Sequence, residues 1–219
     1  MIDAIARRLG AILALGAVVA LALPVGALAG SGSGGSSLFD AFTSTLETTL
    51  TASCGYSTSD VFAAWGDTAQ YSLVPGGDVE AKKHGWKLSG SASVVASKSI
   101  LGGGKRAIGL GPGGQATTQS FCVTLDSPTT RFVVDAPADP TATLRVDVVS
   151  PCSTGSCSMP IGWVYGGDPG LRPVSPMLLF ANLTALLSPD GLATAQLRFT
   201  AERGSWKVDD VYVDPFRRV

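Results

Sequence analysis

The stretch 204–216, GSWKVDDVYVDPF, alternates apolar and polar side chains and therefore predicts a β-strand. It carries three aspartates, two of which, Asp209 and Asp210, are neighbours. Neighbouring residues of a strand point to opposite faces, so one of these two carboxylates is expected to face inward. Asp209 would share its face with Val211 and Val213, which indicates that Asp209 is the inward-facing acid.

The same alternation recurs along the chain, separated by Gly and Pro. It predicts strands at 70–74, 85–90, 92–96, 106–110, 119–125, 130–136, 142–150, 160–166, 194–201 and 206–214. The segment 177–187 is long enough and contains enough leucine to form a helix, but the Val, Thr and aromatic content around it favours a strand. Roughly ten strands without helical repeats between them predict an all-β fold, an antiparallel β-sandwich of jelly-roll type.

The N-terminus has the three parts of a secretory signal peptide, namely a basic pair at 7–8, an apolar run at 9–23 and an A-x-A pattern at 27–29. We expect cleavage after Ala29, so that 1–29 is a signal peptide, 30–57 a flexible Gly/Ser/Thr-rich linker and 58–219 the β-sandwich domain. The protein is then secreted, extracellular or attached to the cell surface, with no lasting membrane span. An apolar segment retained as a membrane anchor is the alternative.

Charge and composition limit the classes of function that the chain can have. The chain of 219 residues has 16 basic and 17 acidic side chains, and 15% of its residues are charged, against about 25% in typical soluble proteins. A formal net charge of −1 gives no basic surface for nucleic acid. Low charge with abundant Gly suits an extracellular β-protein, and the sequence does not specify the oligomeric state.

Four cysteines in a secreted chain indicate disulfides. Cys152 and Cys157 flank a short Gly/Ser loop that one bridge would close, which leaves Cys54 to pair with Cys122. The other two pairings stay open at this level. Zinc is disfavoured because a C-x4-C spacing without a second Cys pair or a nearby His is a poor ligand set.

Catalytic signals are weak. His84 is the only histidine, it lies in the charged turn AKKHGW, and no G-x-S-x-G nucleophile elbow accompanies it. The sequence singles out no pair of carboxylates for glycoside hydrolysis. We therefore expect no catalytic residues and a protein that is not an enzyme.

Aromatic side chains offer one candidate binding surface. Trp163 and Tyr165 are two apart in a predicted strand and therefore share a face. Exposed aromatic rings can stack on the C–H faces of a sugar, whereas most tryptophans of a small sandwich pack in its core. Trp163 and Tyr165 are the candidate ligand-stacking residues, with core packing as the alternative.

Two stretches resemble a known group of domains. Residues 71–95, YSLVPGGDVEAKKHGWKLSGSASVV, resemble the opening of galactose-binding-like jelly rolls, including carbohydrate-binding modules of the CBM4/9 type. Gly77, Glu80, Gly85 and Trp86 match that pattern, while Val79 replaces the usual Phe. Residues 206–215, WKVDDVYVDP, look like the last strand of those modules. The chain also resembles a group of secreted bacterial proteins of unassigned function.

The resemblance implies that the first and last strands lie together and hold a structural calcium ion. Its candidate ligands are Glu80 and Asp209, with Asp210 as a substitute, completed by backbone carbonyls. An inward carboxylate needs a partner because its burial is costly. A buried arginine, Arg131 or Arg198, or backbone N–H groups are the alternatives to calcium.

Three functions stay open. A non-catalytic module that binds carbohydrate or another cell-envelope component predicts exposed aromatic residues. A structural or protein-interaction domain at the cell surface, with no small ligand, predicts tryptophans buried throughout. A secreted hydrolase on a β-sandwich predicts two carboxylates converging in a deep cleft.

Overall fold

The computed structural model describes residues 53–214, which fall within a unit that runs from Asp40 to Val219. The predicted signal peptide and most of the predicted linker lie outside these residues. No helix within the described part is long and apolar enough to cross a membrane.

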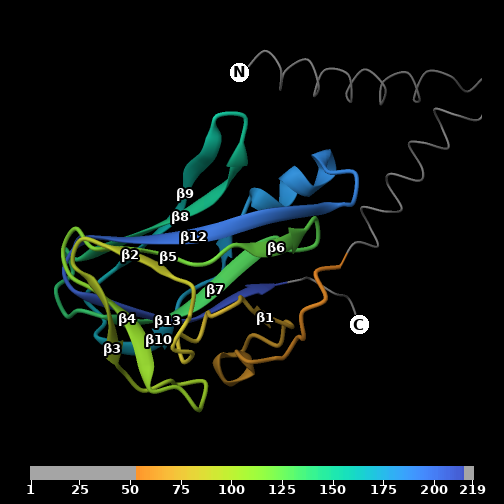
Figure 1. Ribbon diagram of the computed structural model, residues 1–219. Coiled ribbons are helices and arrows are strands. Elements are labelled where there is room, and N and C mark those ends of the chain that lie inside the picture. The colour runs from red at the N-terminus through yellow and green to blue at the C-terminus, as the bar shows by residue number, and fades with distance from the viewer. Residues whose placement is uncertain (1–52, 215–219) are drawn as a thin grey trace, which may run out of the picture. The chain divides into compact units, whose positions relative to one another are not determined.

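The described chain is built almost entirely of strands and turns (Figure 1). In order its elements are η1 Ala63–Trp65, β1 Ser72–Leu73, β2 Lys87–Ser89, β3 Ala92–Ala96, β4 Arg106–Leu110, β5 Gln115–Thr117, β6 Phe121–Thr124, β7 Thr129–Ala136, β8 Thr143–Cys152, β9 Gly155–Tyr165, β10 Gly170–Pro173, β11 Met177–Leu178, η2 Ala181–Leu187, β12 Leu192–Arg203 and β13 Trp206–Asp214, where η marks a 3-10 helix.

The strands form two antiparallel sheets that face each other. Sheet 1 has the order β10-β7-β13-β4-β3, with β1 beside β13 and β11 beside β7. Sheet 2 has the order β2-β5-β12-β8-β9, with β6 beside β12. Figure 1 shows sheet 2 above sheet 1, with the β8–β9 hairpin projecting beyond the layers. This pairing confirms the expected all-β antiparallel sandwich.

The core fills the space between the sheets because inward and outward residues alternate along each strand. On β12, Leu197 and Phe199 are fully buried, while Arg198 between them is partly exposed. Phe199 stacks on Trp86 and meets Phe132 of β7 edge-on, so aromatic rings link the two layers. Trp86 is therefore a core residue.

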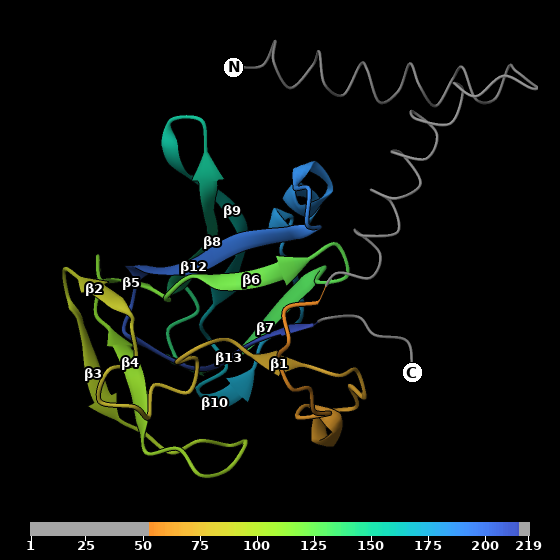
Figure 2. The same cartoon turned by 45° about the vertical axis from the view of Figure 1, so that its right-hand side comes forward.

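The two ends of the domain lie side by side, as the resemblance implies (Figure 2). Ser72 of β1 pairs with Val213 of β13, and the Val74 N–H donates to the Val211 carbonyl. Gly77 allows this approach, because a Cβ on it would lie 2.6 Å from the Val211 carbonyl oxygen. A steric requirement therefore explains why the sequence pattern has glycine at position 77.

Residues 177–187 do not form the strand that composition favoured. Only Met177 and Leu178 pair with β7, and Phe180 then takes a left-handed backbone with φ 54°. A left-handed residue turns the chain out of an extended conformation, and η2 follows from Ala181. The prediction was wrong because local composition carries no information about this turn.

Both expected disulfides form, Cys54–Cys122 and Cys152–Cys157. The second closes the tip of the β8–β9 hairpin. The first fastens the start of the described chain to β6, where Tyr56 also accepts a hydrogen bond from the Cys122 N–H.

Candidate functional site

An aromatic pair stands on the outer face of sheet 2. Val164 of β9 packs in the core, so its neighbours Trp163 and Tyr165 point away from it. Their exposed fractions are 46% and 62%, which are high values for large aromatic side chains. The strand that carries them is the edge of the sheet. The sequence prediction that these two residues share one accessible face is consistent with this placement.

A fixed arginine lies beside the pair. Arg145 of β8 is directly opposite Trp163 in the ladder, so both side chains are on the same face. Its guanidinium contacts Asp147 and Glu202, each at 3.1 Å. Two carboxylates on one guanidinium hold its planar donor groups in a defined orientation. Sequence inspection missed Arg145, because only the β8–β9 register reveals its position.

A groove of about 490 Å³ runs along the free edge of β9. Trp163 and Tyr165 line one side of it, and Arg172 crosses it to donate a hydrogen bond to the Tyr165 carbonyl. Apart from Ser175, the remaining lining is apolar, with Pro176, Met177, Leu178 and Phe180 among its members. No carboxylate or histidine is among the residues that line this groove.

The other tryptophans separate into two kinds. Trp86 and Trp206 are buried, and each indole N–H donates to a backbone carbonyl. Trp65, on η1, is 42% exposed and does not line the groove. Burial of every tryptophan, which the protein-interaction alternative predicted, is therefore not observed.

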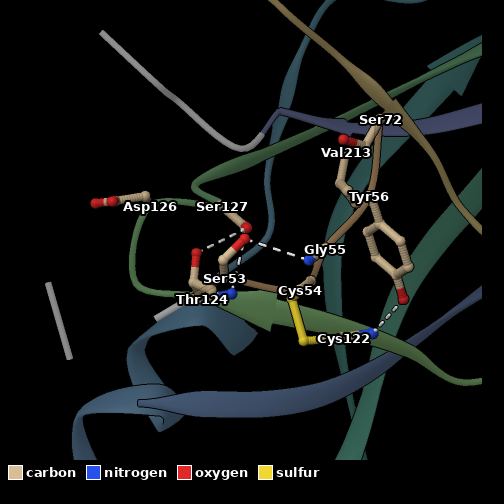
Figure 3. Close-up of a pocket in the computed structure, with 10 residues that line it drawn as sticks. All are labelled: Ser53, Cys54, Gly55, Tyr56, Ser72, Cys122, Thr124, Asp126, Ser127 and Val213. Atoms are coloured by element: carbon tan, nitrogen blue, oxygen red, sulfur yellow. Dashed lines mark hydrogen bonds between the residues drawn. A yellow bond between two sulfur atoms is a disulfide. The ribbon is translucent and has the colours of Figure 1, made fainter. Parts of the chain in front are cut away.

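Two further hollows have a different character. One, of about 450 Å³, lies over sheet 1, and its single carboxylate, Asp135, is held by Lys207 at 2.8 Å. The other, of about 30 Å³, lies beside the Cys54–Cys122 bridge and has room for one water molecule (Figure 3). Neither brings together the two carboxylates that a glycosidase would use.

His84 has a local structural contact. Its Nδ1 accepts a hydrogen bond from the Trp86 N–H, and burial together with the nearby Arg106 charge lowers the pKa of His84. The ring thus helps to set the turn that leads into β2.

Both neighbouring aspartates of β13 are buried, against the alternation expected of them. The ladder with β7 has an irregularity between Asp209 and Tyr212, and Asp210 adopts a left-handed backbone with φ 52°. A bulge of this kind breaks the alternation of faces. Asp209, the acid expected to face inward, is buried, and the bulge gives a reason why Asp210 is buried as well.

The acids of the two chain ends gather at this bulge. Asp209 Oδ1 accepts a hydrogen bond from the Asp210 N–H, and Asp210 Oδ2 accepts one from the Ser99 hydroxyl. Glu80 Oε1 accepts two, from the N–H groups of Lys105 and Arg106. Asp209 Oδ2 is buried and has no hydrogen-bond partner.

The environment of the bulge disfavours the ionised forms of Asp209 and Asp210. Burial, followed by the charge of Asp210 and those of Glu80 and Asp78, raises the pKa of Asp209 to about 8. Burial likewise raises the pKa of Asp210, although the Ser99 hydrogen bond opposes the shift. Glu80 and Asp209 are therefore electrostatic neighbours, which agrees with the implied meeting of the chain ends.

Arginine does not compensate Asp209. Arg131 forms an ion pair with Asp67, donates to the Val174 carbonyl and lies over the ring of Phe62. Within residues 53–214, no guanidinium donates a hydrogen bond to Asp209 Oδ2, and this includes Arg198. Of the two alternatives to calcium, only the hydrogen bond from a backbone N–H is observed. It comes from Asp210 and is accepted by Asp209 Oδ1, not by Oδ2.

The residues at the bulge meet part of the requirement for a divalent cation. Calcium prefers six to eight oxygen ligands, and a buried carboxylate oxygen among other acids supplies one in a negative field. In the described part of the chain, no three Asp, Glu, His or Cys side chains form a group that could hold a metal. Glu80, Asp209 and Asp210 would therefore need backbone carbonyls or water to complete a shell.

Comparisons with known proteins give weak structural matches only. No protein-family model matches the chain, and no curated protein matches it. Solved structures that resemble it include the C-terminal CBM6 of a marine laminarinase from Zobellia galactanivorans (TM-score 0.41, 9% identity, covering 66% of this chain and 98% of that one). Another is a CBM22 xylan-binding domain from Paenibacillus barcinonensis (0.43, 12%, 67% and 94%).

A family 11 carbohydrate-binding module from Clostridium thermocellum, in complex with a β-1,3-1,4-mixed-linked tetrasaccharide, also matches (0.36, 12%, 62% and 91%). At these scores and identities the matches carry no argument about function. The β-sandwich follows from the strand pairing of this chain itself.

Proposed function

We propose that this chain is a secreted, non-catalytic β-sandwich module that binds a neutral carbohydrate along the groove of Trp163 and Tyr165. The observation that carries the proposal is the exposed aromatic pair at a sheet edge, beside a groove with room for a short sugar chain. Rings of this kind stack on sugars through their apolar faces while hydroxyl groups reach polar neighbours.

Arg145 supplies a preorganised donor for such hydroxyl groups. It is held by Asp147 and Glu202 before any ligand arrives, so little side-chain entropy is lost on binding. Each arginine near the pair has a carboxylate partner, because Arg172 likewise pairs with Asp168. A balanced field favours a neutral polysaccharide over an acidic one.

Secretion and the lack of catalysis are supported separately. Two disulfides suit an oxidising compartment, in agreement with the predicted signal peptide. The groove lining offers no carboxylate or histidine for acid–base chemistry. The second candidate function is an interaction domain at the cell surface, which the exposed leucines of η2 favour. No observation of this kind favours a hydrolase.

The first experiment is binding to an array of neutral polysaccharides, with xylan, mixed-linked β-1,3-1,4-glucan and galactan as probes and polygalacturonate as the acidic comparison. Wild-type protein and Trp65→Ala should bind at least one neutral probe, and Trp163→Ala should not. Absence of signal from the wild type on every probe would reject carbohydrate binding.

We also propose that a calcium ion compensates the acids at the β13 bulge, held through Asp209 with Glu80 and Asp210 in support. The orphan oxygen and the raised pKa of Asp209 support this assignment. A cation there would supply charge compensation only and take no part in chemistry.

Chelation tests the calcium ion. Saturating ion would stabilise the fold by about 2–3 kcal/mol, so EDTA should lower the melting temperature by roughly 5 °C at pH 7.5. Asp209→Asn should remove this sensitivity. A melting curve that EDTA leaves unchanged in the wild type would discard the ion.

A further inference from the structure

The short helix η2 presents an apolar surface that nothing in the described chain covers. Leu183, Leu186 and Leu187 are about half exposed, while Ala181, Asn182 and Ala185 of the same helix are buried. Residues three apart eclipse each other in a 3-10 helix, so Leu183 and Leu186 form one ridge. We call these three side chains the leucine patch.

The charges around the leucine patch narrow what can cover it. Between Arg172 and Arg198 the sequence contains no Lys or Arg, and Asp190 is its only acid. A segment without basic residues offers no cation of its own to anionic lipid or nucleic acid. Its complement is an uncharged apolar side-chain stripe.

One segment of this chain carries such a stripe. Phe42, Leu46 and Leu50 recur every four residues, the spacing of one face of a helix, within 40–52, DAFTSTLETTLTA. Ser44, two residues after Phe42, falls on the opposite face at that spacing. These residues lie outside the described part of the structure.

The attachment point of this segment lies close to the leucine patch. The described chain starts at Ser53, which lines the small hollow together with Thr124 and Ser127 (Figure 3). Cys54 is bonded to Cys122 of β6. The next turn along β6 is tied to η2, because Asn182 Nδ2 donates to the Leu125 carbonyl at 2.9 Å.

The tether between this segment and the described chain is short. Leu50 precedes Ser53 by three residues, which span at most about 11 Å when extended. The disulfide fixes Cys54 on β6, so docking of the segment would be intramolecular, with an effective concentration in the millimolar range or above, on the order expected for a short tether. We propose that residues 42–50 dock their Phe42–Leu46–Leu50 stripe on the leucine patch.

Hydrogen exchange on the chain purified from the culture medium tests this docking. Amides of 42–50 should exchange at least tenfold more slowly than in a synthetic peptide of the same sequence. Leu46→Asp and Leu187→Asp should each remove that protection, whereas the matched Ser44→Asp should retain it. Peptide mapping of both disulfides in every variant shows that the sandwich is intact.

Three outcomes would overturn the proposal. The first is no protection of 42–50 in the wild type, and the second is protection that Leu187→Asp leaves unchanged. The third is protection that disappears on dilution together with a sedimenting dimer, which would assign the patch to a second copy. Carbohydrate binding is independent of all three, because Trp163 lies outside the leucine patch.

Discussion

Asp209 is the residue whose environment departs most from what its side chain prefers. It is only 1% exposed, one oxygen lacks a partner and its pKa is raised to about 8. Its neighbours add to the strain: Asp210 and Val79 both have left-handed backbones, and neither is glycine. Residues with strained backbones cluster at active sites and ligand-binding sites. Their presence beside Asp209 agrees with the proposed ion.

The raised pKa gives a pH dependence with a definite sign. In EDTA, folded Asp209 stays protonated up to its raised pKa of about 8, while the unfolded residue ionises near the ordinary aspartate pKa of 3.8. Between these values the folded state binds more protons, so this residue makes stability fall as pH rises. Chemical denaturation at pH 5 and pH 9 should show this fall.

Asp209→Asn serves as the matched control for that measurement, because it keeps the shape and removes the charge. The variant should be more stable than the wild type at pH 9 in EDTA, by a few degrees in melting temperature. Equal pH slopes for wild type and variant would contradict the account of Asp209.

Arg131 illustrates a buried charge that does have partners. Burial alone would raise the pKa of Asp67, but hydrogen bonds from Tyr71 and the Ala69 N–H, with the Arg131 charge, lower it. Arg131→Met leaves that carboxylate without its cation and should cost about 3 kcal/mol in the free energy of unfolding. Urea denaturation measures the loss, and a cost below 1 kcal/mol would show that the pair is dispensable.

The sequence predicted the placement of some of these residues and not of others. Trp163 and Tyr165 could be placed on one face, because an alternating strand needs no tertiary information. Asp209 was recognised as an unusual acid, but its bulge was not, since a one-residue irregularity leaves no trace in the alternation. Arg145 could not be recognised, because its place beside Trp163 depends on strand register.

At the scale of elements, strands followed directly by a chain-breaking residue were the most predictable. The bounds of β3, β4 and β13 match the prediction, and each strand is followed by Ser, Gly or Pro, whereas the longer β8, β9 and β12 extend beyond the predicted bounds. The short strands β5 and β10 were not predicted as separate elements. With three or four residues each, they exist through pairing with a neighbour and not through any local preference.

The two disulfides should differ in their effect on stability. The Cys54–Cys122 bridge spans 68 residues and the Cys152–Cys157 bridge only 5. In the chain-entropy model, longer loops contribute more, about 4 kcal/mol for the first bridge and about 2 kcal/mol for the second. Paired Cys→Ser variants in guanidinium denaturation should show this order, and the reverse order would contradict it.

At the scale of the whole molecule, the meeting of the chain ends organises the fold. β1 and the loop that carries Glu80 lie against β13, so acids distant in the sequence become electrostatic neighbours. The aromatic groove lies elsewhere, where the β9 edge of sheet 2 faces the β10–β11 segment of sheet 1. Removing the proposed ion should therefore lower stability more than it changes ligand affinity.

Calorimetric titration of the best neutral polysaccharide into three proteins tests the central claim most directly. Wild type and Trp65→Ala, which changes a similarly exposed tryptophan outside the groove, should bind with the same dissociation constant. Trp163→Ala should weaken binding at least about tenfold, in keeping with the loss of one aromatic anchor. Equal affinity of Trp163→Ala and wild type would contradict the assignment of the groove.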